Sequence, residues 1–193
     1  MGENKFADWD VGDKYKIEKI IGQGSYGSVA RAIDVSTNTK VAIKKMDDIF
    51  DDEIDCKRIL REVTLLRLLK HPCIVGLKEM LKPSDPNNFT TVYMVLEYAE
   101  SDMKKILKSS LNLELLHICT MVYNLLCALK FLHESKVIHR DLKPANVLVN
   151  EDCSIKLCDF GLARSLTNIK ANSEMILKKE NAKEDHGMHS QSD

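Results

Sequence analysis

The stretch VIHRDLKPANVLVN, residues 137–150, decides the expected fold, because two short apolar segments enclose a loop crowded with polar side chains. That loop includes an imidazole, a carboxylate, two cations and an amide, on His139, Asp141, Arg140, Lys143 and Asn146. A second acidic loop, with the sequence D-F-G, begins at Asp159. The Asp141 carboxylate can accept a proton from a hydroxyl nucleophile, while oxygens of Asn146 and Asp159 suit Mg²⁺, a hard cation. A charged surface turn explains any one of these residues but not all of them at this spacing.

The composition is that of a globular chain and excludes several functional classes. The 193 residues are 44% hydrophobic and 30% charged, which is enough to build the core of one or two domains. A net charge of −1 gives no support for nucleic acid or an anionic membrane surface as a partner. Six cysteines without a C-x-x-C pair indicate reduced, intracellular thiols. The start of the chain lacks a signal-peptide core and no stretch is expected to span a membrane, so we expect the cytoplasm or the nucleus.

A glycine-rich segment near the N-terminus separates two runs with strand periodicity. Residues 15–21 and 28–33 alternate, G-Q-G-S-Y-G occupies 22–27, and V-A-I-K-K at 41–45 predicts a third strand. A dinucleotide-binding fold requires a helix after the glycines and a Walker loop requires G-K-[ST], and neither follows here. The order strand, glycines, strand favours a hairpin lid over a triphosphate, where glycine lets the backbone approach the phosphates. An ordinary glycine-containing hairpin is the alternative, weakened once Lys44 is counted.

Strand alternation places Ala42 and Lys44 on one face, so Val29 and Ala42 can cover an adenine ring while Lys44 reaches the phosphates. Residues 50–70 have helical periodicity, and Glu62 lies in their middle among apolar residues. A carboxylate in that environment needs a cationic partner, for which Lys44 is the expected one. A surface pairing of Glu62 with a nearby arginine is the alternative.

The remaining segments predict further short strands and one long helix. Lys45, on the opposite strand face from Lys44, is expected to be solvated. Residues 111–133 are apolar almost all round, which predicts a helix buried on most sides. Strands are expected at 74–81, 91–96 and 155–158, with a turn-rich loop at 83–88 and a linker at 97–100.

These motifs resemble those of a eukaryotic protein kinase. H-R-D-x-x-x-x-N at 139–146 and D-F-G at 159–161 are similar to its catalytic and magnesium-binding loops. The resemblance implies an α+β fold, with an N-terminal β-sheet lobe and one helix over 13–96 and a hinge at 97–101. An incomplete, mostly α-helical C-terminal lobe is expected over 102–164. A polar lead-in at 1–12 and a polar tail at 165–193, expected to be disordered apart from a short helix around 174–181, complete the chain.

The activity that the resemblance implies is phosphoryl transfer from ATP, with Mg²⁺, to serine or threonine hydroxyls of proteins. Asp141 would orient the hydroxyl, Lys143 would neutralise charge on the transferred phosphoryl group, and Glu62 would hold Lys44 against the α- and β-phosphates. Lysine at position 143 is typical of a Ser/Thr rather than a Tyr enzyme. The implied magnesium ligands are Asn146 and Asp159.

The resemblance also implies a nucleotide pocket. The backbone at Glu97 and Ala99 would pair with adenine, Asp102 would lie near the ribose, and Leu96 would guard the back of the adenine pocket. The full set of implied nucleotide-binding residues is Ile21, Gly22, Gln23, Gly24, Ser25, Tyr26, Gly27, Ser28, Val29, Ala42, Lys44, Glu97, Ala99, Asp102 and Leu148.

The resemblance covers about residues 15–164 and narrows to the mitogen-activated protein kinases. Phe50, ten residues, Arg61-Glu62, seventy-seven residues, Arg140-Asp141, and a cysteine at 153 follow a spacing similar to that family's signature. Cyclin-dependent kinases are a near neighbour, but their cyclin-binding helix motif is missing before Arg61.

Several interactions follow from this narrower resemblance. His117 and Cys153 would border a groove that docks linear motifs of protein substrates and of an upstream kinase, on a monomeric chain. Phosphorylation of Ser25 and Tyr26 at the glycine-loop tip is a hypothesis for inhibition. A phosphothreonine pocket would be formed by Arg61, Arg140 and Arg164.

The sequence departs from the family after the D-F-G loop. No tyrosine follows Gly161, so the T-x-Y activation motif is missing here, as is A-P-E. We therefore expect a kinase domain that stops after its magnesium loop, with an exposed apolar patch on 111–133 and low stability in isolation. Three interpretations stay open: an active kinase, a non-catalytic ATP-binding or partner-docking fragment, and a gene-model or splice fragment without stable function.

Overall fold

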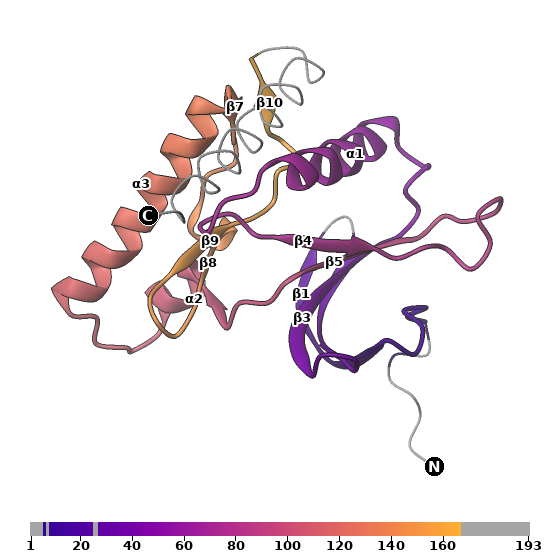
Figure 1. Ribbon diagram of the computed structural model, residues 1–193, viewed down its shortest axis with the longest axis horizontal. Helices are drawn as coiled ribbons and strands as arrows, with labels where there is room; N and C mark the ends of the chain where they lie inside the picture. The colour runs from indigo at the N-terminus through magenta and orange to yellow at the C-terminus, as the bar shows by residue number, and fades with distance from the viewer. Residues whose placement is uncertain (1–5, 7, 25–26, 167–193) are drawn as a thin grey trace, which may run out of the picture.

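The computed structural model describes residues 6, 8–24 and 27–166, and Figure 1 shows their arrangement. A five-stranded antiparallel sheet carries one long helix, α1, and a second group of short strands surrounds the catalytic-loop stretch beside α3. The expected α+β architecture, a β-sheet lobe with one helix followed by a more helical part, is confirmed. Ser25, Tyr26 and the tail from 167 onwards lie outside the described residues.

The large sheet has the strand order β1-β2-β3-β5-β4. Its strands pair antiparallel throughout, and the β1–β2 and β2–β3 hairpins join consecutive strands. The strands are β1 (Tyr15–Gly24), β2 (Gly27–Asp34), β3 (Thr39–Met46), β4 (Leu77–Met80) and β5 (Val92–Glu97).

The two faces of this sheet belong to two different clusters, as strand alternation predicts. Val41 and Ile43 pack on one face with Trp9 at its edge, whereas Ala42 lies on the other face in the main core. Lys44 shares the Ala42 face and lies opposite Val29 of β2 in the register. The sequence prediction that Val29, Ala42 and Lys44 share one face is therefore confirmed.

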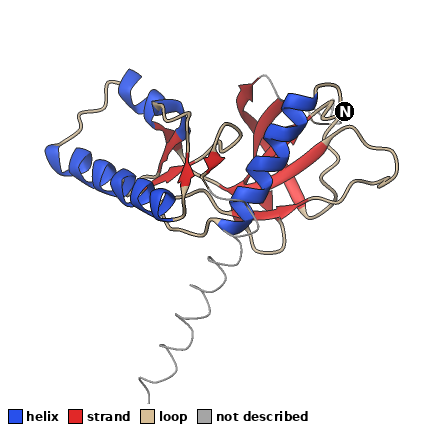
Figure 2. Ribbon diagram, turned by 90° about the horizontal axis from the view of Figure 1, so that it is seen from above, coloured by secondary structure: helices blue, strands red, loops and turns tan. Residues whose placement is uncertain are grey.

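Helix α1 (Glu53–Leu68) is shorter than the 50–70 expected from periodicity. Asp52 caps it by accepting hydrogen bonds from the backbone amides of Ile54 and Asp55, so the preceding residues form a turn instead of a first helical turn. The helix ends before His71-Pro72, where proline disfavours helical backbone in the residue before it. Figure 2 shows α1 lying across the large sheet.

The second part of the molecule is built from short elements around the catalytic-loop stretch. They form a three-stranded sheet of order β6-β8-β9 and a two-stranded pair, β10-β7. The backbone of Leu157 exchanges hydrogen bonds with Cys73 and Val75, which joins this part to the segment after α1. The elements are β6 (Ser101–Asp102), α2 (Met103–Lys108), α3 (Leu115–Glu134), β7 (Val137–Ile138), a 3-10 turn η1 (Pro144–Asn146), β8 (Val147–Val149), β9 (Ile155–Leu157) and β10 (Arg164–Ser165).

Helix α3 differs from the expected buried helix. It begins at Leu115 instead of 111, and only Met121, Ala128 and Leu132 are buried along it. Leu115 is 76% exposed and Leu126 is 59% exposed, so the prediction of burial on most sides is wrong and that of an exposed apolar patch is confirmed. The spacing of apolar residues correctly predicted a helix, but it does not indicate whether another element packs against them.

The same helix bears on the expectation that no segment could span a membrane. By length and composition alone α3 is long and apolar enough to do so, which corrects that expectation. The criterion is weak evidence, because the core helix of a soluble protein also meets it. Contacts of α3 with β7 and β9 give its apolar residues a packing role in this fold.

Candidate active site

The catalytic-loop stretch is anchored by a buried histidine. His139 is 3% exposed, and its Nε2 lies 3.0 Å from the carbonyl oxygen of Cys158. Its Nδ1 accepts a hydrogen bond from the backbone amide of Asp141, which assigns the proton to Nε2. The imidazole also packs edge-on against Phe160, which is fully buried. His139 therefore joins the two polar loops that the sequence places twenty positions apart.

The Asp141 carboxylate is held by two neighbours in the same loop. Its Oδ2 accepts hydrogen bonds from Lys143 Nζ at 2.6 Å and from Asn146 Nδ2 at 2.9 Å. The Lys143 ammonium lowers the pKa of Asp141, and Asp141 in turn raises the pKa of Lys143. Asp141 is thus an ionised acceptor in a fixed orientation, and the three residues that the sequence singled out lie together.

Asp159 lies at the start of the second loop and has a backbone conformation that residues other than glycine rarely adopt. Its φ is 66°, in the left-handed region, and that of Arg140 in the first loop is 67°. Such strain at a polar site is typical of functional loops. Within the described part of the chain the Asp159 carboxylate has no hydrogen bond or ion pair, yet its charge helps to raise the pKa of both Lys44 and Lys143. The carboxylate therefore lies close to two lysines from different parts of the fold.

The neighbouring Cys158 is not a nucleophile in this arrangement. Burial, followed by the charge of Asp159, raises the pKa of its thiol to about 12. A thiol with such a pKa stays protonated at neutral pH, and only the thiolate is reactive.

Lys44 of β3 and Glu62 of α1 form the predicted ion pair. Lys44 Nζ lies 2.7 Å from Glu62 Oε2, and the Glu62 side chain is only 6% exposed. Burial acts to lower the pKa of Lys44, but the charge and hydrogen bond of Glu62 outweigh it and the pKa is raised. The alternative, a surface pairing of Glu62 with an arginine, is wrong for this structure.

The glycine-rich hairpin places its glycines inside the strands, in contrast to the interruption expected at 22–27. Gly22 and Gly24 belong to β1 and pair with Val29 and Gly27 of β2. A Cβ at Gly27 would lie 2.1 Å from the Lys45 carbonyl oxygen, and its φ is 133°, so packing against β3 requires glycine there. A Cβ at Gly24 would meet no atom within 4 Å. Packing within the described protein thus explains the glycine at position 27 but not the one at position 24.

Other predicted hairpin residues lie along the same two strands. Ile21 and Val29 are half-buried and pack against the main core, on which Ala42 also lies. Gln23 pairs with Ser28 in the register between Gly22 and the hairpin tip. Val29 lies opposite Lys44 and shares its face, whereas Ser28 lies opposite Lys45 and therefore belongs, with Gln23, to the other face of the sheet.

The linker after β5 is held firmly at its first residue. The Glu97 backbone amide donates to the Gly76 carbonyl, and its carboxylate accepts from the Gly76 amide and pairs with Lys156 at 2.9 Å. The amide hydrogen of Glu97 is therefore not available to a ligand. Leu96 is buried at the end of β5, opposite Ala42 in the register. Ala99 lies two positions beyond Glu97, outside the regular strand.

Asp102 has a structural role that the sequence analysis did not foresee. It caps α2, accepting from the Lys105 amide at 2.9 Å and pairing with the Lys105 ammonium at 3.0 Å. It also lies opposite Leu148 in the β6–β8 register. The structure thus brings two predicted nucleotide-binding residues side by side, although both carboxylate oxygens of Asp102 already have partners.

The three arginines predicted to bind phosphothreonine lie near one another. Arg61 donates to the Gly161 carbonyl at 2.7 Å. Burial, then the positive charges of Arg164, Arg140 and Arg58, lower the pKa of Arg61. Positive charges that lower the pKa of Arg61 in this way would favour an anion among them.

The two residues predicted to border a docking groove have local roles. His117 lies in the first turn of α3, where its Nδ1 accepts from the Glu114 amide at 3.2 Å. Cys153 occupies the turn between β8 and β9 with a φ of 62°. These positions neither test nor contradict a groove.

The ion pairs that the sequence analysis missed include two between distant segments. Lys45, expected to be solvated, is only 12% exposed and pairs with Asp8 at 2.8 Å, with Trp9 beside it. The Glu97–Lys156 pair joins residues 59 positions apart. No local pattern signals either pair, because each partner comes from a segment distant in the sequence.

Comparison with known proteins supports the assignment of these loops. The protein kinase domain family matches residues 15–181. The chain is 50% identical over 159 residues to mitogen-activated protein kinase 15 of Oryza sativa subsp. japonica, covering 82% of this chain and 32% of that protein. It is 48% identical over 163 residues to mitogen-activated protein kinase 16 of Arabidopsis thaliana, covering 84% of this chain and 29% of that protein. The chain therefore spans about a third of the length of the curated relatives that it matches.

Proposed function

This chain belongs to the protein kinase family, in its mitogen-activated branch, and from that premise we propose that it binds ATP with Mg²⁺ and transfers the terminal phosphoryl group to serine or threonine hydroxyls of proteins. The observation that carries the proposal is the buried ion pair between Lys44 and Glu62. It places a lysine ammonium from the sheet lobe near the Asp159 carboxylate of the second loop. A nucleotide phosphate chain requires that combination of cation and metal-binding acid.

The role of Asp141 follows from the way its carboxylate is held. A substrate hydroxyl that donates a hydrogen bond to Asp141 is oriented by it, and the ionised carboxylate can receive the hydroxyl proton as the nucleophile attacks. Lys143, next to Asp141 and half-exposed, supplies positive charge beside the position of the reacting hydroxyl. Asn146 fixes the carboxylate through its Nδ2, so the acceptor is already oriented before substrate arrives.

The residues present suit a magnesium–nucleotide complex. Asn146 uses its Nδ2 for Asp141, which leaves its Oδ1 as an acceptor, and Asp159 has no partner within the described residues. The described residues contain no cluster of three His, Cys, Asp or Glu side chains, so phosphate oxygens would have to complete the coordination of Mg²⁺. Bound Mg²⁺ would neutralise negative charge that develops on the phosphates. Asn146 and Asp159 would hold it.

The nucleotide itself would lie under the β1–β2 hairpin. Val29 and Ala42 would cover the adenine ring, with Leu148 on its other side and the Ala99 backbone at its edge. Because the Glu97 amide is already bonded to Gly76, an adenine contact at Glu97 would use its carbonyl oxygen. Gly24, whose Cβ would meet no protein atom, is the glycine best explained by approach of phosphates.

Partners and location complete the proposal. Protein substrates and an upstream kinase would dock near His117 and Cys153 on a monomeric chain, in the cytoplasm or nucleus. The arginine cluster at Arg61, Arg140 and Arg164 would receive a phosphothreonine, since bidentate guanidinium groups suit phosphate oxygens.

The second candidate function is a non-catalytic ATP-binding or partner-docking module. The exposed apolar face of α3 favours it, because a helix so close to the catalytic loop is then only partly supported. A poorly supported catalytic loop can retain nucleotide binding while losing the geometry that transfer requires.

A thermal-shift titration of the 193-residue chain with Mg-ATP tests whether the chain forms a stable nucleotide-binding site. We expect a nucleotide-dependent rise in Tm that is lost in Lys44→Met and in Asp159→Asn. Lys16→Met, on the exposed face of β1, is the matched control and should keep the rise.

Phosphotransfer to a mixture of Ser/Thr peptides then distinguishes the two candidates. Transfer that disappears in Asp141→Asn, with the Mg-ATP shift retained, supports the enzyme. A retained shift without transfer supports the non-catalytic module. If Mg-ATP leaves the Tm of the unsubstituted chain unchanged, the enzyme and the ATP-binding form of the second candidate both fail.

A further inference from the structure

The outer face of α3 carries a continuous row of apolar side chains that no described element covers. Leu115, Cys119, Val122 and Leu126 recur at spacings of three or four and therefore lie on one face of the helix. Leu115 is 76% exposed and Leu126 is 59% exposed, and Cys119 is exposed as well. We call these four residues the α3 stripe. An apolar surface of this length in water is a docking surface or an aggregation risk.

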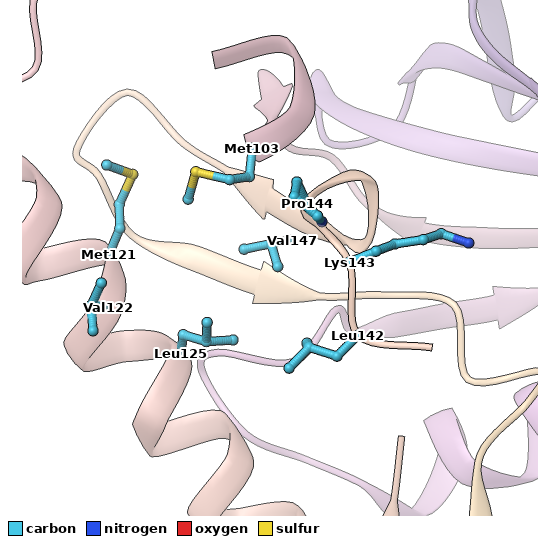
Figure 3. Close-up of a pocket in the computed structure, with 8 residues that line it drawn as sticks. All are labelled: Met103, Met121, Val122, Leu125, Leu142, Lys143, Pro144 and Val147. Carbon is cyan, nitrogen blue, oxygen red and sulfur yellow. The ribbon is translucent and has the colours of Figure 1, made fainter. Parts of the chain in front are cut away.

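An apolar pocket adjoins the stripe on the side of the catalytic loop. It has a volume of about 220 Å³ and shares Val122 with the stripe. Figure 3 shows side chains of α3 on one wall, Met103 of α2 above, and Leu142 and Pro144 of the catalytic loop opposite. The α3 stripe and the pocket together form an apolar surface with a depression near its middle. This shape suits a short apolar segment of chain better than a partner with a flat surface.

The path of the chain brings a candidate segment to this surface. The Leu166 amide donates to the Lys136 carbonyl at 2.8 Å, so the chain leaves the described part just beyond the C-terminal end of α3. Met175 follows nine positions later and opens the triplet Met-Ile-Leu, residues 175–177. Nine residues reach up to about 30 Å when extended. The twenty residues of α3 span about 30 Å, so the triplet can reach any part of the stripe.

We propose that residues 173–179 of this chain dock on the α3 stripe and its pocket, with the side chains of Met175, Ile176 and Leu177 as the apolar contacts. A segment that runs back along α3 carries Lys178 and Lys179 towards the N-terminal end of the helix, where Glu114 is exposed. The tether gives the segment a local concentration in the millimolar range, which favours it over a second copy of the chain at micromolar concentration. This docking is independent of phosphoryl transfer.

Cys119 lies in the middle of the stripe, so the reactivity of its thiol reports whether residues 173–179 cover the stripe. We would measure its alkylation rate by iodoacetamide in the 193-residue protein, using peptide mass spectrometry, with Cys56 of α1 as the internal reference. Replacing the triplet by Met175→Ser, Ile176→Ser and Leu177→Ser should raise the Cys119 rate at least about tenfold, because local cover protects a thiol from reagent. Met188→Ser, elsewhere in the same tail, should leave the rate unchanged.

Carbodiimide cross-linking of the unsubstituted protein supplies a second measurement that needs no variant. We expect a cross-link between Glu114 and Lys178 or Lys179 within the monomer. Equal Cys119 rates in all three proteins, or cross-links found only between two chains with protection that grows with concentration, would overturn the proposal. If the triple substitution also accelerates Cys56, the fold is lost and the monomer cross-link alone decides.

Discussion

Helices α1 and α3 place their side chains in opposite ways. Helix α1 buries a carboxylate, Glu62, whereas α3 exposes Leu115 and Leu126 to solvent. The difference lies in what packs against each helix. One side of α1 faces the large sheet, which supplies Lys44 as a partner for Glu62. One side of α3 packs against β7, β9 and the segment after α1. Burial is thus set by neighbouring elements and not by how apolar a side chain is.

Removing Glu62 tests the α1 side of this comparison and should have the largest effect. Glu62→Ala leaves the Lys44 ammonium buried without a partner, which we expect to lower the free energy of unfolding by about 4 kcal/mol. Urea denaturation measures the change. Glu53→Ala, which removes an exposed pair with Lys57 on the same helix, should cause no measurable loss. Equal losses in the two variants would show that burial does not distinguish them.

Truncating one leucine on each side of α3 sharpens the comparison within a single helix. Leu132 is fully buried, and Leu132→Ala should cost about 3 kcal/mol, through lost transfer energy and a cavity. Leu116 is 71% exposed and lies beside the stripe, so Leu116→Ala should change the free energy of unfolding by less than about 0.5 kcal/mol. A similar cost at both positions, measured by urea denaturation, would contradict the difference in burial between Leu132 and Leu116.

The glycine hairpin offers a similar contrast on the sheet lobe. Gly27→Ala places a Cβ against the Lys45 carbonyl and should lower the free energy of unfolding by about 2 kcal/mol. Gly24→Ala has room for its Cβ and should leave stability unchanged while weakening Mg-ATP binding. Thermal unfolding with and without nucleotide separates the two effects. The opposite pattern would exclude the assignment of Gly24 to phosphate approach.

The smallest effect concerns the pH dependence of the Asp141 network. Lys143 holds the pKa of Asp141 below its ordinary value, so the contribution of the carboxylate to stability is present above that ordinary value and is lost as pH falls through the folded-state pKa. The difference in stability between the unsubstituted protein and Asp141→Asn should therefore shrink below about pH 4. Because Lys143 is half-exposed, the difference at pH 7 should stay under about 1 kcal/mol. A difference that grows with acidification would contradict the assignment.

Much of the site could be predicted from the sequence because its residues are close in the chain. Asp141, Lys143 and Asn146 lie within six positions, and a single loop brings them together. The Lys44–Glu62 pair was also predictable, since a carboxylate among apolar residues must find a cation. Where the partner comes from a distant segment, prediction failed: Lys45 pairs with Asp8, and Lys156 pairs with Glu97.

By itself the sequence determined which chemical groups the loops carry, how they are spaced, and which strand face each residue of β3 occupies. These properties depend on local backbone geometry, which has fixed periods. The tertiary structure alone decided that Gly27 is required by β3, that Lys45 is shielded, and that no described element covers the α3 stripe. Each of these depends on which elements come into contact. Contacts between segments distant in the chain leave no periodic pattern in the sequence, so they could not be predicted from it.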